Sequence, residues 1–419
     1  MELTMIAHAL PKRVALVPEQ QFAQPPANWT TDGQLFYCLE PSVEGLKQAT
    51  LENANYRVRV NNPHDDILGL RNGTFSFGRY VAGIPNSAAP GQQCPDGPDR
   101  ILYQTALGGA RRGYAAAFTG EGTPAQPVVD AEHFELLEVD DWIFAFNTAA
   151  QRGEFHRIDA KLDGNALQLD RPLAFEPTAN DVAKAVLMAY FDQHALTKHD
   201  DPGHLTLGLL FRGEEGPDDI YEALGAKLSM TLEAIQPGAL VSARFEGQCA
   251  RFRHEEPELD GVTLEGLPAG NDPVVSSIGD ETLVKMATFG QPLADIPILG
   301  SLEPKVGITH KPVAGVNGLE GVQGYVGDGW GECGVSFSTY HSKACRQEFV
   351  GRVRKHLLLQ VGIASQRAIG MYWPSLSYRE DPGRGVQTDL TASRLVFRGH
   401  ERMASSEIGR SSLLFLFAN

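Results

Sequence analysis

The feature that most constrains the fold of this chain is a strict alternation of apolar and polar residues in several short segments. At residues 205–211, Leu205, Leu207 and Leu209 occupy every second position, opposite His204 and Thr206. The same period of two recurs at residues 56–60, 228–234, 241–246 and 357–361. Successive side chains of a strand point to opposite faces of a sheet, so this period predicts half-buried antiparallel strands.

Signals for helices are few and short. Pro217-Asp218-Asp219 has the composition of a first helical turn, and Gly225 follows where such a helix would end. A second candidate opens at Pro98 and would end near Gly108-Gly109. We therefore expect a mostly β fold, built from sandwiches or barrels.

Five short motifs recur in the same order at offsets of 180–186 residues, which indicates a tandem duplication. The alternative is chance similarity among β-rich segments. The duplication predicts that Phe211 is equivalent to Phe397, and Met188 to Met371. The two copies would meet near residues 226–238, which gives domains at residues 46–230 and 231–419. Residues 1–45 are punctuated by prolines, and we expect them to form an extended N-terminal arm; the alternative there is a disordered tail.

Charge and composition exclude several classes of protein. The chain has 36 basic and 52 acidic residues, a formal charge of −16, which argues against tight wrapping of nucleic acid. No apolar run approaches the roughly 20 residues that span a bilayer, and no secretory signal is visible at the N-terminus. The five cysteines are scattered and odd in number, which favours a reducing compartment.

Three motifs could hold a cofactor or metal, and each has a plainer interpretation. Gly329–Gly334 fits the glycine pattern of a dinucleotide loop, but a strand pattern rather than a helix follows it, which favours a glycine-rich hairpin. The histidines at 194, 199 and 204 are of metal-ligating type, but their spacing suits neither a helix face nor a strand face. Cys333 and Cys345 lie in no paired zinc motif. We assign no cofactor and no metal.

Charged clusters give no catalytic site either. The pairs Asp140-Asp141 and Asp218-Asp219 could act as catalytic carboxylates, but nothing places them across a cleft. A basic cluster comprises Arg346, Arg352, Arg354 and Lys355. It is interpreted as a solvated hairpin that pairs with acidic neighbours, rather than as a nucleic-acid site, since no aromatic residues are interleaved. We assign no catalytic residues and predict that the protein is not an enzyme.

Three segments give the chain a resemblance to the major tail tube proteins of long-tailed, siphovirus-like bacteriophages. Leu70–Tyr80 looks like the opening strand pair of those proteins, Ile158–Leu173 is similar to their middle segment, and Gly409–Asn419 resembles their C-terminal strand. The likeness is diffuse and spans nearly all of residues 45–419. The chain is about twice as long as the simple family pattern, which leaves open whether residues 84–150 are an insertion.

The resemblance implies a structural virion protein with two tandem tail-tube-type β-sandwich or barrel domains, each with a short helix. It also implies assembly in the bacterial cytoplasm into a phage tail. Its chains would form stacked trimeric, pseudo-hexameric rings that DNA crosses during ejection, without membrane contact. The implied partners are the tail terminator, tape measure and baseplate proteins. We expect the arm and a hairpin near residues 313–345 to cross subunit boundaries, and the lumen to be negatively charged. The alternatives are a baseplate or capsid component, or a carbohydrate-binding or hydrolytic β-sandwich.

Overall fold

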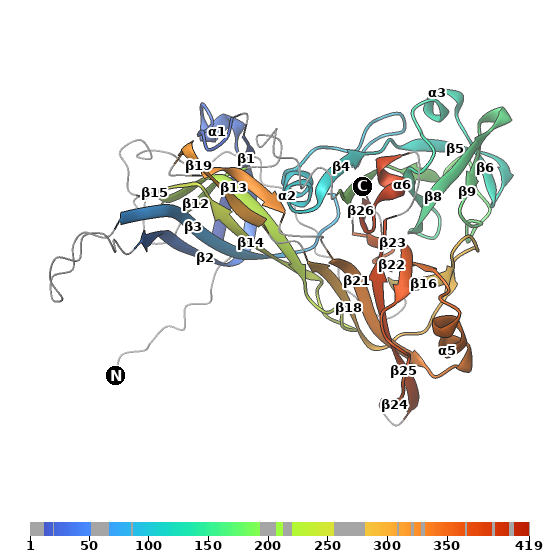
Figure 1. Ribbon diagram of the computed structural model, residues 1–419. Coiled ribbons are helices and arrows are strands. Elements are labelled where there is room, and N and C mark those ends of the chain that lie inside the picture. Colours follow the sequence, from blue (N-terminus) through green and yellow to red (C-terminus); the bar gives the residue numbers. More distant parts are fainter. Residues whose placement is uncertain are drawn as a thin grey trace, which may run out of the picture.

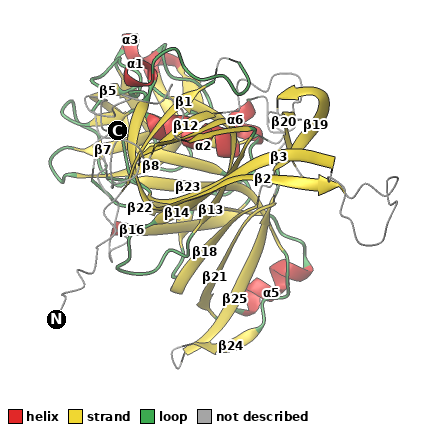
Figure 2. Ribbon diagram, turned by 90° about the vertical axis from the view of Figure 1, so that its left-hand side faces the viewer, coloured by secondary structure: helices red, strands yellow, loops and turns green. Residues whose placement is uncertain are grey.

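The computed structural model describes residues 12–19, 21–51, 67–84, 87–192, 207–212, 220–254, 281–307, 310–319, 322–327, 332–364, 367–387, 390–401 and 406–418. Strands dominate these residues and form several sheets, with short helices between them (Figures 1 and 2). The fold is mostly β, as the alternation of apolar and polar residues predicts. Its strands fall into two similar sets and one inserted barrel.

Six strands of the first set close on themselves. They pair in the order β12-β1-β2-β3-β14-β13, and β13 pairs in turn with β12. A seventh strand, β15, follows β14 in the chain and pairs with the first half of β13. The strands are β1 (Lys12–Pro18), β2 (Gln34–Leu51), β3 (Ile67–Tyr80), β12 (Leu207–Arg212), β13 (Ile220–Leu232), β14 (Ser242–Cys249) and β15 (Arg251–His254).

The inward residues of this set form an apolar core, because alternate residues of each strand share a face. The ring of Phe77 lies 5.4 Å from the ring of Phe36 and 5.4 Å from that of Phe245. Leu16 and Met230 are buried in the same cluster. Burying one such side chain stabilises a fold by about 1.5–3 kcal/mol, so the core ties together strands that are far apart in the sequence.

The second set also contains six strands and a seventh. The six pair in the order β16-β22-β23-β25-β21-β18, and the seventh, β26, pairs with the first half of β23. The strands are β16 (Thr282–Thr288), β18 (Leu299–Gly307), β21 (Glu332–Tyr340), β22 (Lys355–Val361), β23 (Ile369–Tyr378), β25 (Leu390–Gly399) and β26 (Leu414–Ala418).

The two sets share one order of pairing. In chain order, the first strand of each set pairs with the fourth, the fourth with the fifth, the fifth with the sixth, the sixth with the third, and the third with the second. A helix lies between the third and fourth strands of both sets, α2 (Pro98–Leu107) in the first and α5 (Lys343–Val350) in the second. One difference is that β1 pairs with β2, whereas no ladder joins β16 to β18 within the described residues.

The predicted register of the repeat is wrong, although a repeated strand order is present. Phe211 lies on the fourth strand of its set and Phe397 on the sixth. Met188 lies on β11 (Val186–Phe191), outside both sets, whereas Met371 lies on β23. The starts of β1 and β16 are 270 residues apart, but those of β12 and β22 are only 148 apart. Because a long insertion lies between α2 and β12, no single sequence offset aligns all the equivalent strands of the two sets.

The expected domain limits also differ from the strand pairing. Residues 12–18 and 34–45 are not an extended arm, because they lie in β1 and β2 and pair within the first set. The expected boundary between residues 230 and 231 falls inside β13. The described strands of the second set begin at Thr282.

The insertion is a closed barrel with the strand order β10-β5-β6-β9-β8-β7. These strands are β5 (Ala116–Thr123), β6 (Gln126–Val129), β7 (Trp142–Asn147), β8 (Arg152–Leu162), β9 (Ala166–Leu169) and β10 (Val182–Lys184). The strands on either side of the barrel in the chain, β4 (Gly108–Arg112) and β11, extend the second set through the series β23-β26-β11-β4. The open question about residues 84–150 is thus answered in part, since residues 116–147 belong to the inserted barrel.

Gln360 attaches the barrel to the second set. Its side-chain oxygen accepts a hydrogen bond from the backbone N–H of Phe155 at 3.0 Å, and its amide nitrogen donates to the carbonyls of Gly153 and Gly362, each at 2.9 Å. Gln360 is fully buried. Each buried backbone group would otherwise lack a partner, so this one side chain fixes where β8 meets β22.

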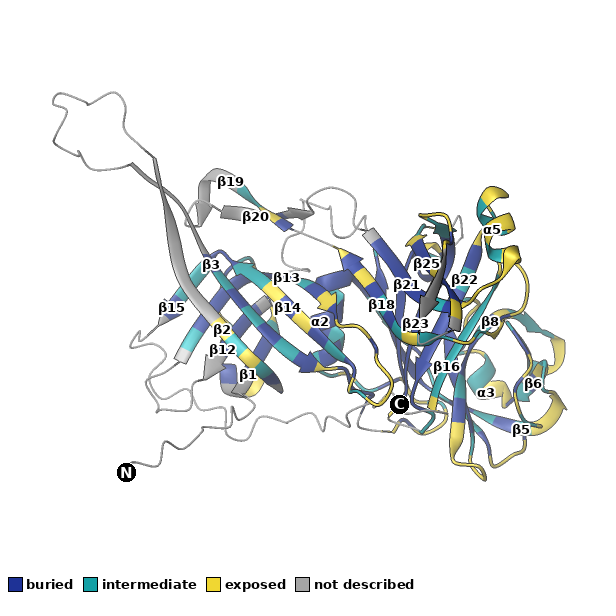
Figure 3. Cartoon of the chain, turned by 90° about the horizontal axis from the view of Figure 1, so that it is seen from below, coloured by how far each residue is buried: buried dark blue, intermediate teal, exposed yellow. Residues whose placement is uncertain are grey.

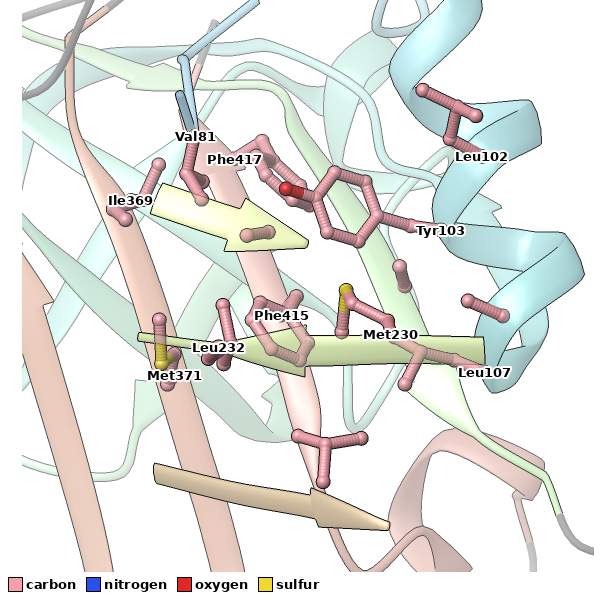
Figure 4. Packing of buried hydrophobic residues seen from close by; sticks show 14 of the residues in the cluster. Val81, Leu102, Tyr103, Leu107, Met230, Leu232, Ile369, Met371, Phe415 and Phe417 are labelled. Carbon is pink, nitrogen blue, oxygen red and sulfur yellow. The ribbon is translucent and has the colours of Figure 1, made fainter. Parts of the chain in front are cut away.

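Helix α2 lies where the two sets meet. Its Tyr103 ring is 5.8 Å from Phe245 of the first set and 4.7 Å from Phe417 on β26. Figure 4 shows Tyr103 and Leu107 directed at Phe415, Phe417 and neighbouring side chains of β13. The helix was predicted at Pro98 to Gly108-Gly109, and this prediction is confirmed.

The other predicted helix is wrong over its described part. Residues 220–225 belong to β13, while residues 217–219 lie outside the described residues. Gly225 has a φ of 61°, a left-handed conformation that costs glycine little, and it lies in the strand instead of ending a helix. The remaining described elements are α1 (Trp29–Asp32), α3 (Ala131–Phe134), the short 3-10 helix η2 (Asp163–Asn165), β17 (Ala294–Asp295), β19 (His310–Leu319), β20 (Val322–Gly327), β24 (Arg384–Gln387) and α6 (Glu407–Arg410).

Candidate assembly surface

Strands β2 and β3 continue beyond the first set as a two-stranded ribbon. β1 pairs with β2 only over Gln34–Cys38, and β14 pairs with β3 only over Gly73–Tyr80. The pairing of β2 with β3 continues outward to Leu51 and Ile67. Over this outer part, each strand has only the other as a hydrogen-bonded neighbour among the described strands. A two-stranded hairpin is marginal in water, and its open edges can pair with another chain.

A buried ion pair fixes the end of β3 that lies opposite the ribbon. The Arg79 guanidinium on β3 binds both carboxylate oxygens of Asp99 in α2, with Nε–Oδ1 and Nη2–Oδ2 distances of 2.9 Å. The guanidinium carbon also lies 5.2 Å from the centre of the Phe36 ring. Removing one member of such a pair leaves a buried charge and typically costs about 3–5 kcal/mol. The pair therefore anchors α2 to the end of β3 that belongs to the first set.

A second buried charge holds β15 in place. Glu222 on β13 is fully buried and accepts hydrogen bonds from Trp29 Nε1, at 2.7 Å, and from the guanidinium of Arg253 on β15. Within the described residues, the other side of β15 has no strand paired to it. The first set therefore presents a second short open edge at a fixed position.

The hairpin of β19 and β20 packs on the outside of the first set. The Tyr325 ring of β20 lies 6.3 Å from the Phe22 ring and belongs to a cluster with Trp29 and Leu210. This hairpin forms a separate two-stranded sheet (Figure 3). It corresponds only in part to the hairpin expected near residues 313–345, since residues 332–340 are strand β21 of the second set. Whether either segment crosses a subunit boundary stays a prediction.

A polar groove of about 430 Å³ lies where this hairpin meets the first set. Lys227 and His310 are both buried there. Burial lowers the pKa of the Lys227 ammonium from 10.5 to about 7. Burial, and next the charge of Lys227, lower the pKa of His310 from 6.5 to about 3. The groove therefore holds a neutral imidazole and a lysine that titrates near neutral pH.

The neighbouring carboxylates of Asp140 and Asp141 make two separate contacts. Burial raises the Asp141 pKa to about 6, although Arg111, at 3.2 Å, opposes the shift. Asp140 instead accepts a hydrogen bond from Ser406 at 2.6 Å. These carboxylates join the loop before β7 to β4 and α6, and they face no shared cleft. Asp218-Asp219 lies outside the described residues.

The other candidate motifs do not gather into a site in the described part of the chain. Cys333 is buried on β21 and Cys345 lies on α5. The histidines at 194, 199 and 204 and the glycines at 329 and 331 lie outside the described residues, and β21 is the strand expected after that glycine motif. No group of three or more possible metal ligands occurs among the described residues.

The basic cluster is divided among several acidic and polar partners. Lys355 binds Glu348 at 2.6 Å, and Arg346 lies 3.6 Å from Asp381. Arg354 donates to Ser375 at 3.4 Å. The pairing with acidic neighbours agrees with its interpretation from the sequence, but helix α5 stands where a hairpin was expected.

Sequence reasoning missed the charged groups that build this surface. Arg79, Glu222 and Lys227 lie in strands whose composition gave no sign that these charges are buried. The partners of Arg79 and Glu222 are more than 15 residues away in the chain, so no local pattern could have identified them.

No protein-family model matches the chain, and a search of the curated proteins finds no match. Among the described helices, none is long and apolar enough to cross a bilayer. Three features of the described residues are candidates for an assembly surface: the open ribbon, the β15 edge and the packed hairpin.

Proposed function

We propose that this protein is a structural subunit that polymerises into the tail tube of a long-tailed bacteriophage and forms the conduit for DNA ejection. The observation that supports this most is the repeated strand order, because it places two copies of one β unit in a single chain. Three chains would supply six such units, and a closed ring of them leaves no lateral interface unfilled.

The open-edged ribbon supports stacking of those rings. Strand addition between chains provides backbone hydrogen bonds without a large apolar surface. Stacking is heterologous, since different surfaces meet, and it can therefore continue as an open filament. The tail terminator, tape measure and baseplate proteins would bind at the ends and in the lumen of the tube.

The net negative charge of the chain is compatible with a conduit for DNA. A surplus of 16 acidic charges permits a negative lumen, which would repel DNA phosphates. A cationic lining would instead gain affinity through counterion release at every ring and slow the passage of DNA.

Electron microscopy of the purified protein tests the proposal. We expect three chains per ring, threefold symmetry and stacked rings with a lumen of net negative charge. Six identical chains per ring would contradict the trimer, and a lining mainly of Lys and Arg would contradict the repelling channel. Closed rings that never stack would favour a baseplate or capsid component.

A matched pair of variants tests the ribbon. Replacing residues 48–71 by an Asn-Gly turn joins the paired residues Lys47 and Asn72, which removes most of the ribbon but leaves the β1–β2 and β3–β14 ladders. We expect folded protein that no longer stacks into tubes. The matched variant is Arg79→Met in the full-length chain, which keeps the ribbon but breaks the buried pair with Asp99, and it therefore separates loss of folding from loss of stacking. Normal tubes from the first variant would refute the role of the ribbon.

A further inference from the structure

Helix α5 and the residues beside it form an exposed apolar surface. Six large apolar side chains are exposed in the described part of the chain, and three of them, Phe289, Tyr340 and Val350, lie at or next to α5. The backbone N–H of Phe289 donates to the carbonyl of Arg354, just after the helix, at 2.9 Å. No residue of α5 is buried, and Val350 at its end is 73% exposed. Apolar side chains grouped in this way mark a surface that a partner covers.

The groove along this surface is basic. Its volume is about 1020 Å³, and its lining includes Lys343, Arg346, Val350 and Pro382. The Arg346 side chain is 72% exposed and lies 3.6 Å from Asp381, a loose pair that can exchange partners. Lys343 is exposed and has no ion pair among the described residues. The groove therefore suits a partner that combines carboxylates with an exposed apolar side chain.

The segment that contains α3 has these properties. Glu132, Glu135 and Glu138 are all exposed. Glu138 lies 2.9 Å from Arg111, whereas Glu132 and Glu135 make no ion pair within the described ranges. Val139, which follows, is 47% exposed. The segment from α3 to Val139 is thus complementary in charge to the α5 surface, and each of the two carries an exposed valine.

The two surfaces lie at opposite ends of one axis of the molecule. In Figure 1, α3 is at the top and α5 is near the bottom of the same side; Figure 2 keeps the vertical direction and again places α3 above α5. The α3 segment of a chain therefore cannot reach the α5 groove of the same chain. A contact between them joins two copies through different surfaces, so it can repeat along the axis as an open filament.

We propose that the α5 groove of one copy binds the α3 segment of a second copy, so that chains stack head to tail along this axis. Opposite charges favour association and set the register of the contact, and the exposed apolar side chains lose water contact when they meet. This inference rests on the proposed tube, and it adds a second stacking contact to that of the ribbon.

Charge reversal with compensation tests this contact. The variant Lys343→Glu with Arg346→Glu should raise the concentration needed for half-assembly by at least about tenfold, measured by sedimentation velocity at low salt. Adding Glu132→Lys and Glu135→Lys to the same chain should restore most of the assembly, because every contact then joins opposite charges again. The matched control, Arg152→Glu with Lys305→Glu, changes the net charge equally at two exposed positions and should stay within about twofold of wild type.

A photo-crosslinking residue in place of Val350 gives a second readout, with crosslinks expected to residues 130–139 of another copy. Mixing isotope-labelled with unlabelled chains distinguishes crosslinks between copies from those within one chain. If wild type forms tubes but the α5 variant assembles equally well, the control is equally impaired or no such crosslink forms, this contact is refuted while the tube proposal stands. A wild-type chain that remains monomeric at all concentrations would refute both.

Discussion

The ring of Tyr103 lies 4.7 Å from the ring of Phe417, and this contact joins the helix of the first set to the last strand of the second. Tyr103 is fully buried, as is Phe417. The two sets therefore share one core around α2 instead of forming independently folded units. Rotation of one set relative to the other would require opening that core. In the proposed ring, such a junction would keep a fixed angle between the two positions that one chain occupies.

Two substitutions of Tyr103 should change the free energy of unfolding in opposite directions. The Tyr103 hydroxyl is buried and has no hydrogen-bond partner among the described residues. Tyr103→Phe should therefore raise the free energy of unfolding by about 1 kcal/mol, since the unsatisfied group disappears. Tyr103→Ala should lower it by about 3–5 kcal/mol through the cavity left behind. Urea titration followed by circular dichroism measures both; destabilisation by the Phe variant would show that the hydroxyl has a partner.

Gln360 should control the attachment of the inserted barrel. Gln360→Leu removes three hydrogen bonds and leaves the buried N–H of Phe155 and carbonyl of Gly153 without that partner. We expect a loss of about 2–4 kcal/mol in the free energy of docking, from one to two unsatisfied buried groups. Hydrogen exchange should rise first in β8, while strands of the first set stay protected. Gln360→Glu keeps the acceptor oxygens, so at low pH it should reduce the free energy of docking less than Gln360→Leu does. An equal rise of hydrogen exchange in both sets would contradict this account.

Deleting residues 1–40 should unfold the first set. The sequence alone favoured a removable arm, whose loss would spare the domains and impair only polymerisation. Instead β1 pairs with β12 and β2 pairs with β1, and Val14 and Phe36 are fully buried. We expect the 41–419 chain to lose its cooperative thermal transition, whereas the 12–419 chain keeps it. A cooperative transition of normal enthalpy in the 41–419 chain would show that β1 is dispensable.

Local sequence patterns predicted where several strands lie, but not which strands pair with one another. The period of two found β12, β13, β14 and β22, because alternation is a property of each strand alone. It could not fix the register of the repeat, since one alternating segment matches another at any even shift. Pro217-Asp218-Asp219 illustrates a related ambiguity, because the same residues suit a helix start and a turn. The ribbon, the β15 edge and the Arg79–Asp99 pair depend on contacts between distant segments, so only the structure could locate them.

Lys227 predicts how stability depends on pH. Burial lowers its pKa from 10.5 in the unfolded chain to about 7 in the folded one. Between these values the unfolded chain binds a proton that the folded chain does not, so the free energy of unfolding rises with pH from about 7 upward. The buried thiols of Cys94 and Cys249, whose pKa is raised to about 12, act in the opposite direction only above pH 9. The window from pH 7 to 8.5 therefore isolates the lysine.

Across that window, wild type should gain about 1.5 kcal/mol in its free energy of unfolding, at most 1.36 kcal/mol per pH unit for one proton. Lys227→Met has a similar volume and no titratable group, so its free energy of unfolding should lack this rise. Urea titrations of both proteins at four pH values give the difference directly, and contributions from all other groups cancel in it. Parallel curves for the two proteins would mean that Lys227 remains protonated in the fold, with its charge balanced by a partner.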